Sequence, residues 1–163
     1  LDVDGVYEND QTQLLDDLSG RLFAQLKNEG DVHMHVLGAT GTGKSRCLFG
    51  KDGEEGLIER WADKFYSQRN MRGHAIIDLQ IFDVSDEVIY DLLCPGRTGA
   101  LRFSPTGGPW VDGLSRHLAG NKEEFSSLLK DALTVKAASL LRKDDMISQL
   151  CIRCMCSYDA EGG

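Results

Sequence analysis

Three segments of the chain place apolar residues three and four positions apart, which is the spacing of a helix with one buried face. The first covers residues 14–26. The second is interrupted early by the charged, glycine-rich stretch 50–56 and resumes at Leu57. The third follows Asn121, which forms with Glu124 the asparagine version of a capping box. The apolar positions on the predicted helical faces are Leu14, Leu15, Leu18, Leu22, Phe23 and Leu26, then Leu57, Ile58, Trp61, Ala62, Phe65 and Tyr66, then Phe125, Leu128, Leu129, Ala132, Leu133, Ala137, Leu140 and Leu141.

Shorter runs of apolar or alternating character predict strands. The run VHMHVL at residues 32–37 leads directly into a glycine-rich stretch, and we expect its histidines, His33 and His35, to be packed and hydrogen-bonded in the core rather than functional. The segment DEVIYDLL at 86–93 is predicted as a short helix or turn that ends at CPG. The other predicted strands are residues 74–84, 101–103, 109–114 and 148–158. Because helices and strands alternate, the sequence predicts an α/β fold with a central, mostly parallel sheet flanked by helices.

The stretch GATGTGKS at residues 38–45 matches the phosphate-binding pattern GxxxxGK[ST]. Its glycines allow backbone amides to close on phosphate oxygens. Lys44 would supply the charge for the β- and γ-phosphates, and the hydroxyl of Ser45 could bind Mg²⁺. The predicted strand before it and helix after it are the context of a P-loop NTPase, so we expect ATP or ADP with Mg²⁺, the alternative being a glycine turn without a ligand. The residues assigned to the nucleotide are Gly38, Ala39, Thr40, Gly41, Thr42, Gly43, Lys44 and Ser45, with Ser45 also assigned to the metal.

Composition and charge narrow the class of protein. The chain has 163 residues, 41% of them hydrophobic and 27% charged, which suits a single globular domain. A net charge of −8 argues against nucleic acid as a partner, since a nucleic-acid footprint is basic. No apolar run approaches the roughly 20 residues that span a membrane. The chain begins with Leu1 rather than Met, so we expect it to be a piece of a longer protein.

Five cysteines raise the question of a metal site. Three of them, Cys151, Cys154 and Cys156, lie in CIRCMC, but a zinc site would need a second ligand pair, and neither a CxxC nor an HxxxH pair occurs elsewhere. On a strand, Cys154 and Cys156 would share one face and Cys151 would point to the other. We expect buried thiols in a central strand, which suits a reducing cytosol.

The glycine-rich stretch and four further blocks resemble the kinesin motor domain family. The segment GATGTGKSRCLFG resembles the kinesin signature GQTGSGKTYTMxG. The blocks that resemble the family's other motifs, in the same order, are VDGVYENDQTQ (FDxVFxxxxxQ), EGLIERWADKF (GIIPRxxxxLF), LQIFDVSDEVIYDLL (LEIYNExxxDLL) and WVDGLSRHLAGNKEEFSSLL (VxGLxxxxVxSxxExxxLL). The resemblance runs along nearly the whole chain.

The resemblance implies a cytoplasmic, cytoskeletal ATPase motor whose partner is the microtubule. Residues 1–163 would form one partial domain that lacks the family's first strand and second switch, with the oligomeric state set by segments outside the chain. The resemblance also places Arg46 where family members often carry a residue that touches the purine. A guanidinium can stack on a base, although an arginine exposed in the first helical turn is the equal structural alternative.

One family motif is poorly matched. The switch NxxSSRSH should fall near DDMISQLC, where only Ser148 agrees and where Ile147, Gln149 and Leu150 cannot replace a serine–arginine–serine set. Whether ATP is hydrolysed is therefore left open. The alternatives are a catalytically degenerate kinesin-like scaffold on a cytoskeletal assembly and, third, an unrelated P-loop enzyme.

Overall fold

The computed structural model describes residues 11–29, 34–37, 39, 41–67, 74–85, 87–105, 108–140 and 148–159. The chain divides into two compact units, Leu1–Met71 and Arg72–Gly163. None of the helices in these described ranges combines the length and the apolar character needed to cross a membrane.

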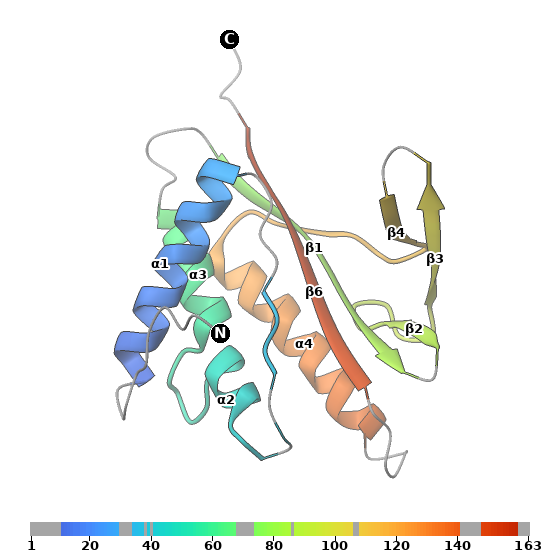
Figure 1. Ribbon diagram of the computed structural model, residues 1–163, viewed down its shortest axis with the longest axis horizontal. Helices are drawn as coiled ribbons and strands as arrows, with labels where there is room; N and C mark the ends of the chain where they lie inside the picture. Colours follow the sequence, from blue (N-terminus) through green and yellow to red (C-terminus); the bar gives the residue numbers. More distant parts are fainter. Residues whose placement is uncertain are drawn as a thin grey trace. The chain divides into compact units, whose positions relative to one another are not determined.

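The described residues of the first unit form three helices, α1 (Gln11–Glu29), α2 (Lys44–Phe49) and α3 (Leu57–Ser67) (Figure 1). The predicted apolar face of α3 is confirmed, since Leu57, Ala62, Phe65 and Tyr66 are buried. Two polar contacts join α3 to α1. Arg60 Nη1 donates to Asp16 Oδ1 at 2.9 Å, and Lys64 Nζ donates to the Asp16 carbonyl at 2.9 Å.

The strand predicted before the glycine-rich loop is wrong in its described part. Residues 34–37 have no regular secondary structure, and 32 and 33 lie outside the described residues. Leu37 is 89% exposed, and His35 is exposed rather than packed in a core; His33 lies outside the described residues. An apolar run indicates a tendency to be buried, but a strand also needs a neighbour for its backbone N–H and C=O groups, and residues 34–37 appear in none of the ladders that the structure describes.

The second unit contains a six-stranded sheet and one long helix (Figure 1). Its elements are β1 (His74–Ser85), β2 (Val88–Asp91), β3 (Thr98–Ser104), β4 (Gly108–Asp112), β5 (His117–Ala119), α4 (Lys122–Leu140) and β6 (Ser148–Asp159). The strand order is β4-β3-β2-β1-β5, with β6 also paired to β1. β6 pairs with the whole length of β1, so β2 and β5 share the opposite edge of β1.

The expectation of a mostly parallel sheet is wrong for the described strands, since all five described pairings are antiparallel. The reason lies in the position of β1. β5 and β6 both run antiparallel to β1 and therefore run in the same direction as each other, with α4 joining them. A helix between two co-directional strands is the unit that alternation predicts. Here β1 lies between those two strands, so no parallel pair forms between them.

Within the segment predicted as a short helix or turn at 86–93, residues Val88–Asp91 form a hairpin strand instead. Ser85 pairs with Val88, and Glu87 in the connection has a φ of 65°. The residues of β2, VIYD, include two β-branched side chains and an aromatic one, which favour a pleated strand. The predicted turn at CPG is confirmed by a hydrogen bond from Arg97 N to the Cys94 carbonyl at 3.0 Å.

The core of this unit lies between α4 and one face of β1. Alternate residues of β1, namely Ala75, Ile77, Leu79 and Ile81, are at most 1% exposed. Phe125, Leu129 and Ala132 are buried at helical spacing along α4. Each large apolar side chain buried in this way contributes about 1.5–3 kcal/mol.

The capping box predicted at the start of α4 is present. Glu124 N donates to Asn121 Oδ1 at 2.9 Å. The Glu124 carboxylate reaches back and accepts from Gly120 N at 2.8 Å, one residue before the cap. The start of α4 is thus fixed directly after β5.

Candidate nucleotide-binding site

The glycine-rich loop enters α2 through two residues in left-handed conformation. Gly41 has a φ of 83° and Gly43 a φ of 88°. An added Cβ would meet no atom within 4 Å at either position, so glycine is needed there for the backbone angle rather than for space. Two of the predicted nucleotide residues, Gly38 and Thr40, lie outside the described residues.

The side chains of the loop converge on one carbonyl. Lys44 Nζ donates to the Ala39 carbonyl at 2.7 Å, and Thr42 Oγ1 donates to the same oxygen at 2.8 Å. Lys44 therefore turns back over its own loop instead of extending away from it. The Lys44 ammonium thus lies against the backbone of the loop that the sequence predicts to bind phosphate.

The first turn of α2 presents the remaining predicted residues. The helix is closed by Cys47 N, which donates to the Gly43 carbonyl at 2.9 Å. Ser45 and Arg46 are both exposed in this turn. A single serine hydroxyl fits Mg²⁺, because Mg²⁺ in nucleotide sites takes only one or two protein oxygens and completes its shell with phosphates and water.

A tight hairpin follows α2 and folds back on it. Lys51 and Glu54 exchange backbone hydrogen bonds of 3.1 and 3.0 Å across Asp52 and Gly53. Both central residues have positive φ, 55° and 90°, which is the pattern of a type I′ turn with its Asp-Gly signature. Gly50 is required for close approach, since a Cβ there would lie 1.9 Å from the Glu54 carbonyl oxygen. The hairpin is thereby held in one geometry.

Through this hairpin Arg46 acquires a partner. Arg46 Nη2 donates to Glu54 Oε2 at 3.1 Å, and both side chains are exposed to solvent. Sequence reasoning assigned Arg46 but missed Glu54. The Asp52-Gly53 pair was a signal for the turn, yet the register that brings Glu54 to Arg46 depends on the bend at Gly50.

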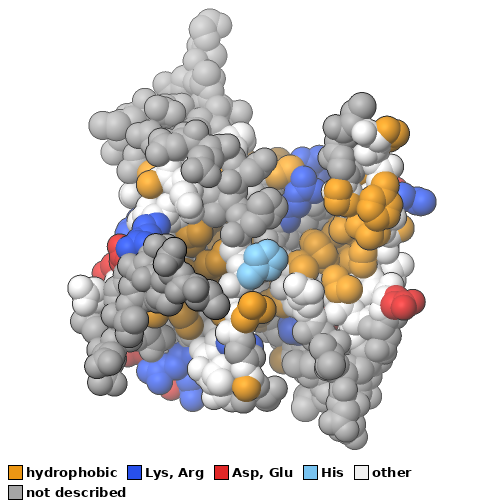
Figure 2. Space-filling view, viewed as in Figure 1, with side chains coloured by type: hydrophobic (Ala, Val, Ile, Leu, Met, Phe, Trp, Pro, Cys, Tyr) orange, Lys and Arg blue, Asp and Glu red, His pale blue; other side chains and the backbone are white. Residues whose placement is uncertain are grey.

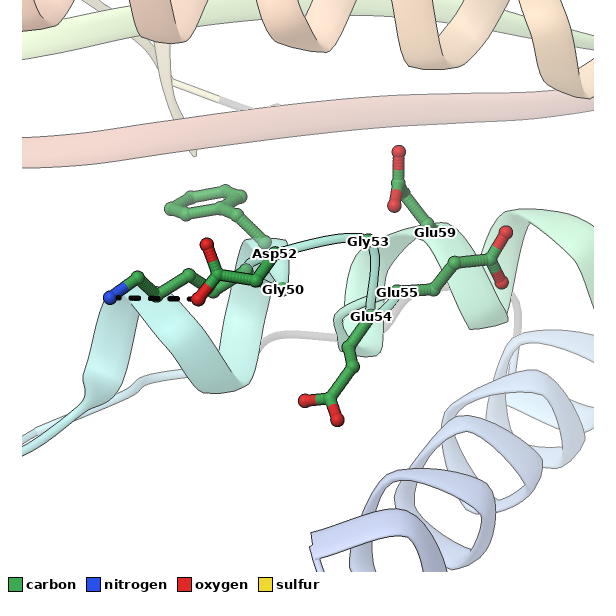
Figure 3. A pocket seen from close by; sticks show the side chains of 8 residues that line it. Gly50, Asp52, Gly53, Glu54, Glu55 and Glu59 are labelled. Carbon is green, nitrogen blue, oxygen red and sulfur yellow. Dashed lines mark ion pairs between the residues drawn. The ribbon is translucent and has the colours of Figure 1, made fainter.

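A shallow concavity of about 250 Å³ lies along the hairpin and is lined by four carboxylates, Asp52, Glu54, Glu55 and Glu59 (Figure 3). Their side chains point in different directions in Figure 3, and Asp52 is paired with Lys51 at 3.8 Å. No cluster of three metal-ligating side chains occurs among the residues that the structure describes.

The region expected to carry the family's first switch is described only from Ser148 onward. Residues 144–147 lie outside the described residues. Ser148, Gln149 and Leu150 lie in β6, where they pair with Ser85, Val84 and Asp83. The described half of this region is thus regular strand.

The cysteines of β6 divide between the faces of the sheet as predicted. Cys154 lies opposite Leu79 and Cys156 opposite Ile77, on the face with the apolar core, while Cys151 lies opposite Phe82 on the other face. Burial raises the pKa of Cys154 to about 12 and that of Cys156 to about 11. All three thiols are partly buried and free of disulfides. The raised pKa values of Cys154 and Cys156 favour their protonated thiol forms at neutral pH.

Comparison with known proteins identifies a family model and relatives that match the chain. The kinesin motor domain model matches residues 3–146. The kinesin-like protein KIF14 of Mus musculus is 26% identical over 150 residues, covering 85% of this chain and 9% of that protein. KIF18B of Homo sapiens is 32% identical over 130 residues, covering 67% of this chain and 15% of that protein.

Solved structures agree with the sequence comparison. A KIF14 structure with ADP on a microtubule matches with a TM-score of 0.69 and 25% identity, over 82% of this chain and 40% of that one. A KIF14 dimer with AMP-PNP on a microtubule matches with the same TM-score and 23% identity, over 83% of this chain and 40% of that one. The chain therefore spans less than half of the motor structures it matches and a small part of the full-length relatives. It belongs to the kinesin motor domain family.

Proposed function

We propose that residues 38–46 bind ADP or ATP with Mg²⁺, as a nucleotide site of a microtubule-based motor. The observation that carries this proposal is the loop around Ala39, in which left-handed glycines and the inward-turned Lys44 produce a cationic cradle. Exchanging the Ala39 carbonyl for phosphate oxygens gives Lys44 a charged partner, which makes a stronger hydrogen bond. Ser45 would hold the metal, whose role is to neutralise phosphate charge. The expected location is the cytoplasm, on the cytoskeleton.

Replacing Lys44 tests this proposal. Lys44→Ala removes one charge-assisted contact and should weaken binding of Mg-ADP by roughly 1.5–3 kcal/mol, measured by titration calorimetry. Lys51→Ala is the matched control, since it removes an equal charge from the neighbouring hairpin. Equal affinities of the wild type and Lys44→Ala would refute the cradle.

A second candidate function is a kinesin-like scaffold that binds nucleotide without a motor cycle. The observation that favours it is the position of Gln149 and Leu150 in β6 where the family's switch is expected. Neither side chain can supply the charge that stabilises a transferring phosphoryl group. The two functions share the nucleotide site and differ in turnover.

A further inference from the structure

The ion pair between Arg46 and Glu54 joins the acidic hairpin to the first turn after the phosphate loop. Arg46 follows Lys44 by two residues, which places it about 200° around the helix axis. Arg46 therefore leaves α2 on another side than Lys44, and its side chain pairs with Glu54 rather than with the loop. Arg46 is one of the residues proposed above to bind the nucleotide, and the part of the ligand left for it beyond the phosphates is the nucleoside.

The hairpin fixes the backbone position from which Glu54 reaches Arg46. Its turn is closed by two backbone hydrogen bonds between Lys51 and Glu54. Gly50 N also donates to the Arg46 carbonyl at 2.9 Å, so the hairpin begins on the backbone of the same arginine whose side chain it engages. An arginine on the surface normally samples many rotamers, and holding it in one of them lowers the entropy lost when it stacks on a base.

We propose that Glu54 is a positioning residue that holds the Arg46 guanidinium for contact with the nucleoside part of a bound nucleotide. This inference rests on the proposed nucleotide site at residues 38–46. It predicts that the acidic hairpin strengthens nucleotide binding, although its negative charge alone would weaken it. A carboxylate near a phosphate site should repel the ligand, whereas Glu54 should strengthen binding of a nucleotide through Arg46.

The test separates the nucleoside from the phosphates by comparing Mg-ADP with Mg-pyrophosphate in calorimetric titrations of the full chain. Glu54→Gln should weaken Mg-ADP about two- to fivefold, the range expected for an exposed ion pair. Arg46→Ala should weaken it about three- to tenfold through loss of stacking on the base. Neither change should weaken Mg-pyrophosphate.

Two further readouts distinguish positioning from a structural role. The double variant should bind Mg-ADP no more weakly than Arg46→Ala alone, because Glu54 acts only through Arg46. The effect of Glu54→Gln should vanish at about 1 M ionic strength, where the Debye length is roughly 3 Å. Glu55→Gln is the matched control, as it removes the same charge from the next position of the hairpin and should not weaken Mg-ADP.

Several outcomes would overturn the proposal. It is wrong if Glu54→Gln and Glu55→Gln behave alike, if Mg-pyrophosphate weakens as much as Mg-ADP, or if the two single changes add in the double variant. A wild-type chain that binds neither ligand would instead refute the nucleotide site itself, and the positioning role with it. Binding of both ligands with no effect of Glu54→Gln would refute the positioning role alone.

Discussion

Asp91 organises the turns of the second unit through one buried carboxylate. It is 3% exposed. Its Oδ1 accepts from Leu93 N at 2.9 Å and from Cys94 N at 3.0 Å, and its Oδ2 accepts from Ser115 N at 2.6 Å. The β2–β3 turn and the segment after β4 are thereby tied to the same side chain.

Removing this carboxylate should destabilise the unit. Asp91→Ala leaves three backbone N–H groups without their acceptor, and we expect the free energy of unfolding to fall by about 2–4 kcal/mol. Urea unfolding followed by circular dichroism measures it. Asp112→Ala is the control. Asp112 is exposed, accepts from Gly113 N and forms an exposed ion pair with Arg102 at 3.7 Å, so its loss should cost under about 1 kcal/mol. Equal losses in the two variants would show that Asp91 has no organising role.

The contacts of individual residues differ in how well they could be predicted from the sequence. Asn121 and Glu124 were predictable as a cap because both partners lie within one turn of the helix. Ser115 lies 24 positions from Asp91, and Glu54 reaches Arg46 only through a folded hairpin. Contacts of this kind depend on chain reversals whose register is not encoded in a local pattern.

At the scale of elements, helices were predicted better than strand pairing. The helical periodicity of α1, α3 and α4 is a local property of 11 to 19 residues. The three residues of β5 are too few to show a period, and no strand was predicted there. The alternation of helices and strands could not show whether paired strands run parallel or antiparallel, because that depends on which edge of β1 each strand joins.

The contact between α4 and β1 contains a buried ion pair that allows a test. Lys136 Nζ donates to Asp83 Oδ1 at 2.5 Å, and the two side chains are 16% and 7% exposed. Lys136 continues the buried stripe of α4, four residues after Ala132.

Removing one partner of the pair should lower the free energy of unfolding more than replacing both partners with apolar side chains. Lys136→Met leaves the Asp83 carboxylate buried and unpaired, so we expect a loss of about 3–5 kcal/mol in the free energy of unfolding. The double variant Lys136→Met, Asp83→Leu should recover most of that loss, since apolar side chains of similar volume can replace a buried pair. Denaturant titration of the wild type, Lys136→Met, Asp83→Leu and the double variant measures the coupling. Strictly additive single and double effects would argue against direct pairing.

For the whole molecule, two regions bear on function: the glycine-rich loop, which matches the kinesin signature, and the switch region, which does not. Gly41 and Gly43 of the proposed nucleotide loop have left-handed backbone conformation, while the described part of the switch region is strand. Apolar side chains also gather on the β3–β4 hairpin, where Leu101, Phe103 and Trp110 are 53%, 72% and 43% exposed (Figure 2). Nothing in the described residues shows what covers this face.

Turnover is the property that separates the two proposed functions. We predict that the 163-residue chain binds Mg-ATP but shows no increase in phosphate release when polymerised microtubules are added. A cradle binds the ground state and the transition state about equally, so it does little for the chemical step without a group that stabilises the transferring phosphoryl. Gln149 and Leu150 supply no such group, and the net charge of −8 opposes docking on an acidic polymer.

The measurement is a phosphate-release assay with and without microtubules, together with co-sedimentation, on the wild type and on Lys44→Ala. Background hydrolysis by contaminating enzymes is recognised because it persists in Lys44→Ala. A slow rate that microtubules leave unchanged and that Lys44→Ala abolishes would support a nucleotide-binding scaffold. A rate that rises with microtubule concentration in the wild type and not in Lys44→Ala would establish a working motor, and stimulation would then have to come from groups other than residues 148–150.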